Sequence, residues 1–176
     1  MIFLETKIRG ALLIEPERLE DERGFFARAW SEREFETRGL NPRLVECSLS
    51  FNVRRGTLRG MHYQIEPYRE AKLVRCTMGA IYDVILDLRR DSKTFKEWLA
   101  VDLTAESRKM LYIPEGVAHG FQTLVDNTEV FYQISEVHNL ESARGVRWDD
   151  AEFGVIWPIR DPIMSLRDGS YPDFGE

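Results

Sequence analysis

The chain has 176 residues, of which 43% are hydrophobic and 31% are charged. This length suits one domain, residues 1–176, that can bury a hydrophobic core of its own. The formal net charge of -6 argues against a nucleic-acid-binding protein, since such proteins usually carry a basic surplus. It does not exclude an anionic small molecule, because a local cluster of Arg and Lys can hold a phosphate on an acidic protein.

The two cysteines, Cys47 and Cys76, are too few for a disulfide framework and have no zinc-site spacing. We expect both to be reduced and structural, which fits a cytoplasmic protein. The N-terminal residues Met1–Glu5 reach an acid before any signal-peptide apolar region forms. The apolar run Ala80–Leu88 is interrupted twice by Asp and is too short to cross a membrane, so no membrane partner is expected.

The first element expected along the chain is an apolar, alternating segment that contains Ile2, Leu4 and Ile8. A helix follows over residues 31–38. Ser31 and Glu34 have the spacing of a capping box at its start, and Gly39 suits the position just after its end. From residue 147 onward we expect an irregular tail packed on the barrel, with a short helix near residues 150–153.

Between the helix and the tail, short β segments separated by turn signals predict a sandwich or barrel. In residues 80–88 the alternation gives two unlike faces, and the face with Ile81, Asp83, Ile85 and Asp87 is mixed enough to line a polar cavity. The predicted strands are residues 44–51, 57–64, 71–77, 80–88, 99–103, 109–113, 120–124 and 129–135.

The strand at residues 57–64 carries two candidate site residues, Arg59 and His62. On a regular strand these two side chains point to opposite faces. A bulge at Gly60 would turn both toward one cavity. Taken alone, however, His62 is better explained as a core histidine.

Two later strands each place a polar side chain among apolar neighbours. Lys72 shares a face with Val74, and it either snorkels to a barrel end or acts in a site, two readings of about equal weight. Tyr132 shares a face with Val130 and, on its own, reads as a core tyrosine with its hydroxyl satisfied. Residues 166–173 alone read as a polar tail.

The turn at residues 113–121 places His119 at the start of a strand, a pattern that recurs in cupins, where such a histidine often binds a metal. A metal site would need further ligands in suitable spacing. His62 stands alone in its strand, and His138 has no evident partner. We therefore expect no metal.

Taken together, a set of spaced strings agrees with one family: Arg23–Phe26, Gly56–Gln64, Lys72–Arg75, Ile81–Val84, Asp87–Arg89, Pro114–Phe121, Arg144–Asp150 and Trp157–Pro158. They resemble the dTDP-4-dehydrorhamnose 3,5-epimerase family over nearly the whole chain. The resemblance implies a mainly β, cupin-type double-stranded β-helix (jelly roll) with a few short peripheral helices.

The resemblance also implies a reaction, namely epimerisation at C3, C5 or both of a nucleotide-linked 4-keto-6-deoxyhexose in deoxysugar (rhamnose-like) biosynthesis. Protons at C3 and C5 adjoin the ketone, so a base can remove one and give an enolate. Return of a proton to the other face inverts the carbon. By resemblance, His62 is the base, Asp168 its partner, Lys72 faces the enolate oxygen and Tyr132 is the acid. No cofactor is implied.

The resemblance assigns substrate binding to further residues. Arg23 and Arg59 would grip the diphosphate, since the Arg fork of donors suits phosphate oxygens. Phe26 would line the pocket, and His119 would assist at the reacting oxygen or hold the sugar. Gln64 and His138 complete the expected binding set.

The chain departs from the family at positions that contact the nucleotide. Arg28, Cys47 and Leu49 stand where the family often has Glu, Gln and Asn, and His138 stands where it often has an aromatic residue, usually Tyr. The catalytic set therefore matches while the nucleotide-reading set differs, which leaves the identity of the nucleotide open.

Family members are usually dimers with exchanged N-terminal strands. We therefore expect a homodimer in which residues 3–7 pair with a second copy, and in which Arg23 or Phe26 serves the partner's site. Three alternatives remain open: a 3,4-ketoisomerase on a similar substrate, a metal-dependent cupin enzyme, and a non-catalytic sugar-nucleotide-binding module.

Overall fold

The computed structural model describes residues 1–175 of the chain. Strands dominate, and the two helices are short. The elements are β1 (Ile2–Glu5), β2 (Leu12–Glu15), β3 (Arg18–Asp21), β4 (Gly24–Ala27), α1 (Glu32–Thr37), β5 (Glu46–Asn52), β6 (Leu58–Gln64), β7 (Lys72–Met78), β8 (Ala80–Asp87), β9 (Trp98–Thr104), β10 (Met110–Ile113), β11 (Val117–Thr123), β12 (Thr128–Ile134), β13 (Ala143–Gly145) and α2 (Leu166–Gly169).

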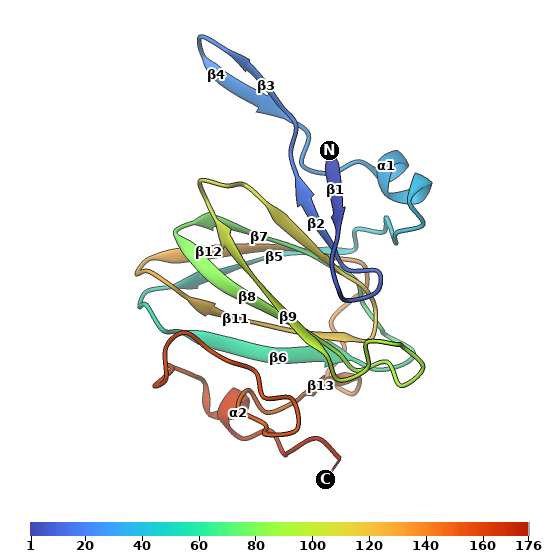
Figure 1. The fold of residues 1–176 in the computed structure, drawn as a ribbon, viewed down its shortest axis with the longest axis vertical. Coiled ribbons are helices and arrows are strands. Elements are labelled where there is room, and N and C mark those ends of the chain that lie inside the picture. The colour runs from blue at the N-terminus through green and yellow to red at the C-terminus, as the bar shows by residue number, and fades with distance from the viewer. Residues whose placement is uncertain (176) are drawn as a thin grey trace.

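Two antiparallel sheets pack face to face and form the jelly roll that was predicted (Figure 1). One sheet has the strand order β1-β2-β10-β7-β12-β5, and the other has the order β13-β6-β11-β8-β9. All eight predicted strands are present, as β5 to β12, with ends shifted by three residues or fewer.

Three apolar clusters form the core, one between the two sheets and one on the outer face of each sheet. The first lies between the sheets and contains Val74 of β7, Ile85 of β8 and Val130 of β12. The second joins the outer face of the five-stranded sheet to the C-terminal tail, and it contains Met61 of β6 together with Phe153 and Trp157 of the tail. The third places α1 on the outer face of the other sheet. Both faces of β8 are therefore buried, and the mixed face predicted for it points between the sheets.

Helix α1 confirms the predicted helix but not its predicted cap. Ser31 is the N-cap residue with extended backbone, yet its side chain makes no capping hydrogen bond. Glu34 instead pairs with the N-terminal ammonium of Met1 at 3.2 Å, so the capping box was wrong because a stronger charged partner takes the carboxylate. Gly39 has φ +68° after the helix end, as predicted. Phe35 anchors the helix and is fully buried.

Two segments lie outside the sheets. The β3–β4 hairpin projects away from the barrel (Figure 1). The C-terminal tail crosses the outer face of the five-stranded sheet, as predicted, but residues 150–153 form turns rather than a helix. The helix of the tail is α2, which begins after the N-cap Ser165. Within residues 1–175, neither helix is long enough to cross a membrane.

Candidate functional site

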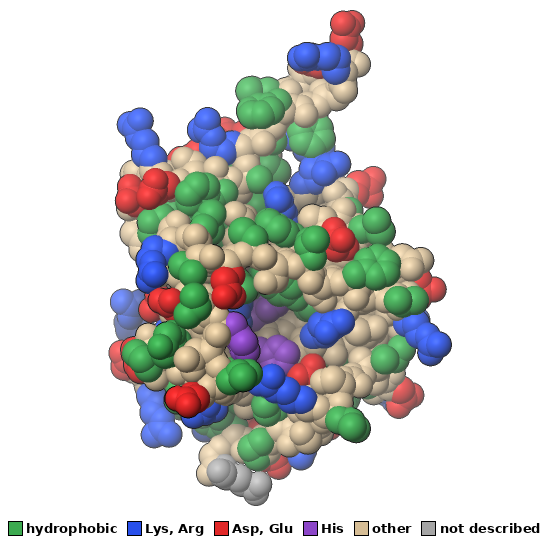
Figure 2. Space-filling view, turned by 180° about the vertical axis from the view of Figure 1, so that it is seen from behind, with side chains coloured by type: hydrophobic (Ala, Val, Ile, Leu, Met, Phe, Trp, Pro, Cys, Tyr) green, Lys and Arg blue, Asp and Glu red, His purple; other side chains and the backbone are tan. Residues whose placement is uncertain are grey.

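A cavity of about 320 Å³ opens between the two sheets, and side chains from both sheets line it. On the face shown in Figure 2, histidine side chains lie inside a hollow bordered by acidic and basic groups. The cavity brings together eight of the ten predicted site residues in or beside it: Arg59, His62, Gln64, Lys72, His119, Tyr132 and His138 line it, and Asp168 contacts His62.

The predicted bulge in β6 is present. Opposite β11, His62 pairs with His119 and Arg59 pairs with Phe121, so two β6 residues face one β11 residue between these pairs. Arg59 and His62 consequently point into the same cavity, while Met61 packs under the tail. Gly60 is required here, because a side chain on it would begin 2.5 Å from the Cα of a β11 residue.

His62 and Asp168 form a hydrogen-bonded pair, with 2.7 Å between His62 Nε2 and Asp168 Oδ1. Asp168 lies in α2, where its backbone N–H donates to Ser165 Oγ and fixes the start of the helix. Burial alone would raise the pKa of Asp168, but its hydrogen bond with His62 and the imidazolium charge hold it below the ordinary value. With Nε2 bonded to Asp168, Nδ1 is the ring nitrogen left for other contacts.

A second histidine–carboxylate pair lies deeper in the cavity. His119 Nε2 and Asp83 Oδ1 are 2.7 Å apart, and both side chains are almost fully buried. The sequence indicated that Asp83 lies on a mixed face but did not place it in the site. His119 lies on the neighbouring strand β11, three residues after Gly116, and the alignment of β8 with β11 places it diagonally opposite Asp83.

Tyr132 approaches the cavity from the six-stranded sheet, opposite the sheet that carries His62. Its ring packs edge-on against His119, with 6.0 Å between the ring centroids. Burial, with a smaller contribution from the carboxylate of Asp83, raises the pKa of Tyr132 far above its ordinary value, although Arg59 opposes this. The phenol is therefore held in its protonated form, and the higher pKa also makes it a weaker acid.

Lys72 does not snorkel to a barrel end but is held inside. Its Nζ lies 2.9 Å from Glu70 Oε1, and it donates to the backbone oxygen of His62 at 3.3 Å. The side chain is 12% exposed and lines the cavity. An ammonium group thus faces the space next to the proposed base.

Gln64 and His138 both line the cavity, and Gln64 is buried. The Gln64 amide donates to the backbone oxygens of Tyr68 and Val137 and accepts from Asn139 N, so its polar atoms join β6 to these two segments. His138 lines the cavity and is exposed. Arg144 and Arg167 also line the cavity, although sequence reasoning did not select them.

Arg23 and Phe26 do not reach the cavity of their own chain. Both lie on the β3–β4 hairpin, where the Arg23 side chain is 85% exposed and Phe26 is 70% exposed. Cys47 and Leu49 also point away, because alternation along β5 turns Ser48 and Ser50 into the cavity. Arg28 lies at the base of the hairpin and contacts Glu34.

The residues that could hold a metal do not cluster. Within residues 1–175 there is no group of three or more His, Cys, Asp or Glu side chains arranged around a common point. The two inner histidines each have Nε2 bonded to a carboxylate instead.

Comparison with known proteins identifies the family. The family model described as dTDP-4-dehydrorhamnose 3,5-epimerase matches residues 5–176. A protein of that name from Shigella flexneri is 40% identical over 169 residues, which cover 96% of this chain and 93% of the relative. Another from Methanothermobacter thermautotrophicus is 42% identical over 177 residues, covering 99% and 95%.

A solved structure agrees with this relation. The Bacillus anthracis dTDP-4-dehydrorhamnose 3,5-epimerase, crystallised with TDP and PPi bound, superposes with a TM-score of 0.94 at 40% identity, covering 98% of both chains. The fold and the predicted resemblance are thus confirmed. The chain belongs to the dTDP-4-dehydrorhamnose 3,5-epimerase family of isomerases.

Proposed function

We propose that the chain epimerises C3 and C5 of a nucleotide-diphosphate-linked 4-keto-6-deoxyhexose. The observation that carries the proposal is the placement of a base and an acid on opposite sheets around one cavity. His62, backed by Asp168, enters from β6, and the protonated phenol of Tyr132 enters from β12. A sugar ring between them would meet a base on one face and an acid on the other.

The proton transfers balance with these groups. His62 Nδ1 takes the proton from C3 or C5, and the electron pair of the C–H bond moves into the carbonyl to give an enolate. The Lys72 ammonium faces the developing oxyanion, a kind of contact that is worth about 3–4 kcal/mol in oxyanion holes. Tyr132 then gives its proton to the opposite face of the carbon, and the ketone reforms. His62 releases its proton to solvent and the Tyr132 phenolate takes one up from solvent, which restores both groups before the second carbon reacts.

Binding of the diphosphate would use the cationic side chains that line the cavity. Arg59 is held by Asn52, whose Oδ1 accepts from Arg59 Nε at 2.8 Å, and it has further donors for phosphate oxygens. Arg144 and Arg167 add two more guanidinium groups. The Bacillus anthracis relative was crystallised with TDP, which supports a thymidine nucleotide. His138 lines the cavity at a position where the family often has an aromatic residue. The preferred nucleotide therefore has to be measured directly.

The protein would act as a homodimer in the cytoplasm. Its hairpin exposes Leu19 and Phe26, 68% and 70% exposed respectively, which suits contact with a second copy. Strand β1 pairs with β2 of its own chain and forms one edge of the sheet, so residues 3–5 could still pair with another chain along their free side. Cys47 and Cys76 are free thiols, which suits a reducing compartment.

NMR in deuterated water with a dTDP-4-keto-6-deoxy sugar tests the function. The expected result is deuterium at both C3 and C5, with inverted products. Deuterium at a single carbon would restrict the activity to that centre. A product with the ketone moved to C3 would instead identify a ketoisomerase, and no solvent exchange with any of the dTDP, UDP, GDP and CDP sugars would overturn the proposal.

A further inference from the structure

Glu70 is a buried acid that the chemistry above does not use. It lines the cavity just before β7, and its side chain is only 6% exposed. Its Oε1 pairs with Lys72, whereas Oε2 is buried without a hydrogen-bond partner among residues 1–175. Burying a carboxylate with one oxygen unpaired lowers the stability of the folded protein, so we look for a functional role for Glu70.

The geometry of Lys72 indicates that role. An ammonium group has three N–H donors. One points to Glu70 Oε1 at 2.9 Å, and another points to the backbone oxygen of His62 at 3.3 Å. Because Lys72 also lines the cavity, the third donor remains for an oxygen of the bound sugar. Two fixed partners therefore set the direction of the third donor.

The backbone on both sides of Glu70 is held in place. Ala71 N donates to Ser135 Oγ at 2.8 Å, and Ser135 N donates to the oxygen of Ala71 at 3.0 Å. On the other side, Gln64 Nε2 donates to the oxygen of Tyr68 at 2.7 Å. These bonds fix the backbone from which the Glu70 side chain reaches Lys72.

Charge gives a second reason for a carboxylate at this place. Arg59 lines the same cavity, and His62 becomes an imidazolium when it takes a proton. Both would repel the Lys72 ammonium while the enolate forms. The negative charge of Glu70 offsets this repulsion at contact distance, where electrostatic interaction in a poorly solvated site is strong.

We propose that Glu70 is a positioning residue, which aims the Lys72 ammonium at the C4 oxygen as the enolate forms. This inference rests on the proposed function. It assigns to Glu70 an effect on the reaction that passes through Lys72 alone, with no contact between Glu70 and the substrate.

Kinetics of Glu70→Gln test the inference, since Gln has nearly the same shape but lacks the charge. We expect kcat for deuterium exchange to fall about 10- to 100-fold, as for a misplaced catalytic group, with KM within about twofold of wild type. In a Lys72→Met background, Glu70→Gln should lower kcat by less than about a further twofold, because the ammonium that Glu70 positions is already absent. Glu66→Gln is the matched control, since Glu66 lies on the same segment, is exposed and pairs with Arg69 instead.

Three results would overturn the inference: a kcat of Glu70→Gln equal to wild type, an undiminished loss in the Lys72→Met background, or an increase in KM alone. Ser135→Ala is the second variant, because it removes the acceptor of the Ala71 N–H hydrogen bond and leaves the charges of Glu70 and Lys72 unchanged. It should lower kcat in the same direction, and a wild-type kcat would count against the proposal even if Glu70→Gln fails to fold. Absence of exchange in the wild-type protein would instead overturn the proposed function itself.

Discussion

Single residues decide the acid–base chemistry, and Asp168 matters most for the proposed base. Its carboxylate bonds His62 at 2.7 Å and stabilises the imidazolium that forms when the proton is taken. We expect Asp168→Asn to lower the rate of deuterium uptake roughly 10²- to 10⁴-fold, the range of a positioned base. Solvent-exchange NMR measures this rate. Asp161→Asn, an exposed change in the same tail, is the control and should keep the wild-type rate.

Tyr132 should separate proton removal from inversion. In Tyr132→Phe the base is intact, so His62 can still remove a proton, exchange it with solvent and return deuterium to the same face. We expect deuterated sugar of retained configuration, with inverted product reduced more than about 100-fold. Chromatographic separation of the epimeric sugars distinguishes the two configurations, and mass spectrometry counts the deuterium in each. Inversion at the wild-type rate would show that another group, or water, is the acid.

The sequence predicted the inner site residues better than those at its edge. Gly60 in an otherwise regular strand signals a bulge, so the joint orientation of Arg59 and His62 follows from local chemistry. Asp168 could come only from the family resemblance, because more than 100 residues separate it from His62. Asp83 was missed as a partner of His119, because the sequence of neither strand shows how the two strands are aligned in the sheet.

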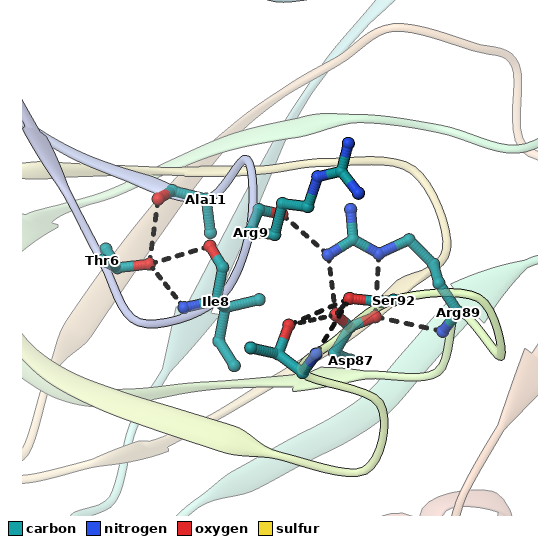
Figure 3. Close-up of polar contacts among 8 residues, drawn as sticks. Thr6, Ile8, Arg9, Ala11, Asp87, Arg89 and Ser92 are labelled. Carbon is teal, nitrogen blue, oxygen red and sulfur yellow. Dashed lines mark hydrogen bonds and ion pairs between the residues drawn. The ribbon is translucent and has the colours of Figure 1, made fainter.

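Among the elements, the end of β8 shows how a buried charge ties loops to a sheet. Asp87 is fully buried and accepts hydrogen bonds from Arg89, Ser92 and Thr94. Arg89 also donates to the backbone oxygen of Arg9 at 2.7 Å, so the same cluster holds the loop between β1 and β2 (Figure 3). The cluster therefore joins two connections that are far apart in the sequence.

This cluster gives a prediction for stability against pH. Burial would raise the pKa of Asp87, but the hydrogen bonds prevail and lower it from 3.8 to about 2. A folded-state pKa below the unfolded value gives stability above pH 4, here about 2 kcal/mol, that is lost as the pH falls toward 2. Urea unfolding should show Asp87→Asn less stable at pH 7, with a smaller difference from wild type at pH 3. Asp91→Asn, exposed in the same loop, should show neither effect.

Strands β5 to β12, which pack on the core, were predicted, whereas β2, the β3–β4 hairpin, β13 and α2 were missed. Strands β7 and β8 each turn one face toward the other sheet, and β8 buries its second face under the C-terminal tail. The β3–β4 hairpin has no such pattern, because all of its residues except Ala27 are exposed in the chain. The position of α2 likewise depends on the contact between Asp168 and His62, which no local propensity encodes.

At the scale of the whole molecule, the hairpin and the outer face of β5 both expose large apolar side chains. The hairpin projects away from the barrel (Figure 1), and the side chains of Arg23 and Phe26 on it are exposed. On β5, Leu49 and Phe51 are 64% and 50% exposed. Large exposed apolar side chains on a projecting arm are a common feature of interfaces. A symmetric dimer would let each hairpin reach the cavity of the other copy.

Complementation tests this arrangement more sharply than mass alone. His62→Asn and the double variant Arg23→Ala/Phe26→Ala should each have low activity, the first through the base and the second through the hairpin. When the two are refolded together, half of the dimers should be mixed. Each mixed dimer has one site with an intact His62 and an intact hairpin from its partner, so about a quarter of wild-type activity should return. A hairpin that served its own chain would give no recovery, and a monomer by light scattering would contradict the dimer itself. Refolding each variant alone is the control, and neither should regain activity.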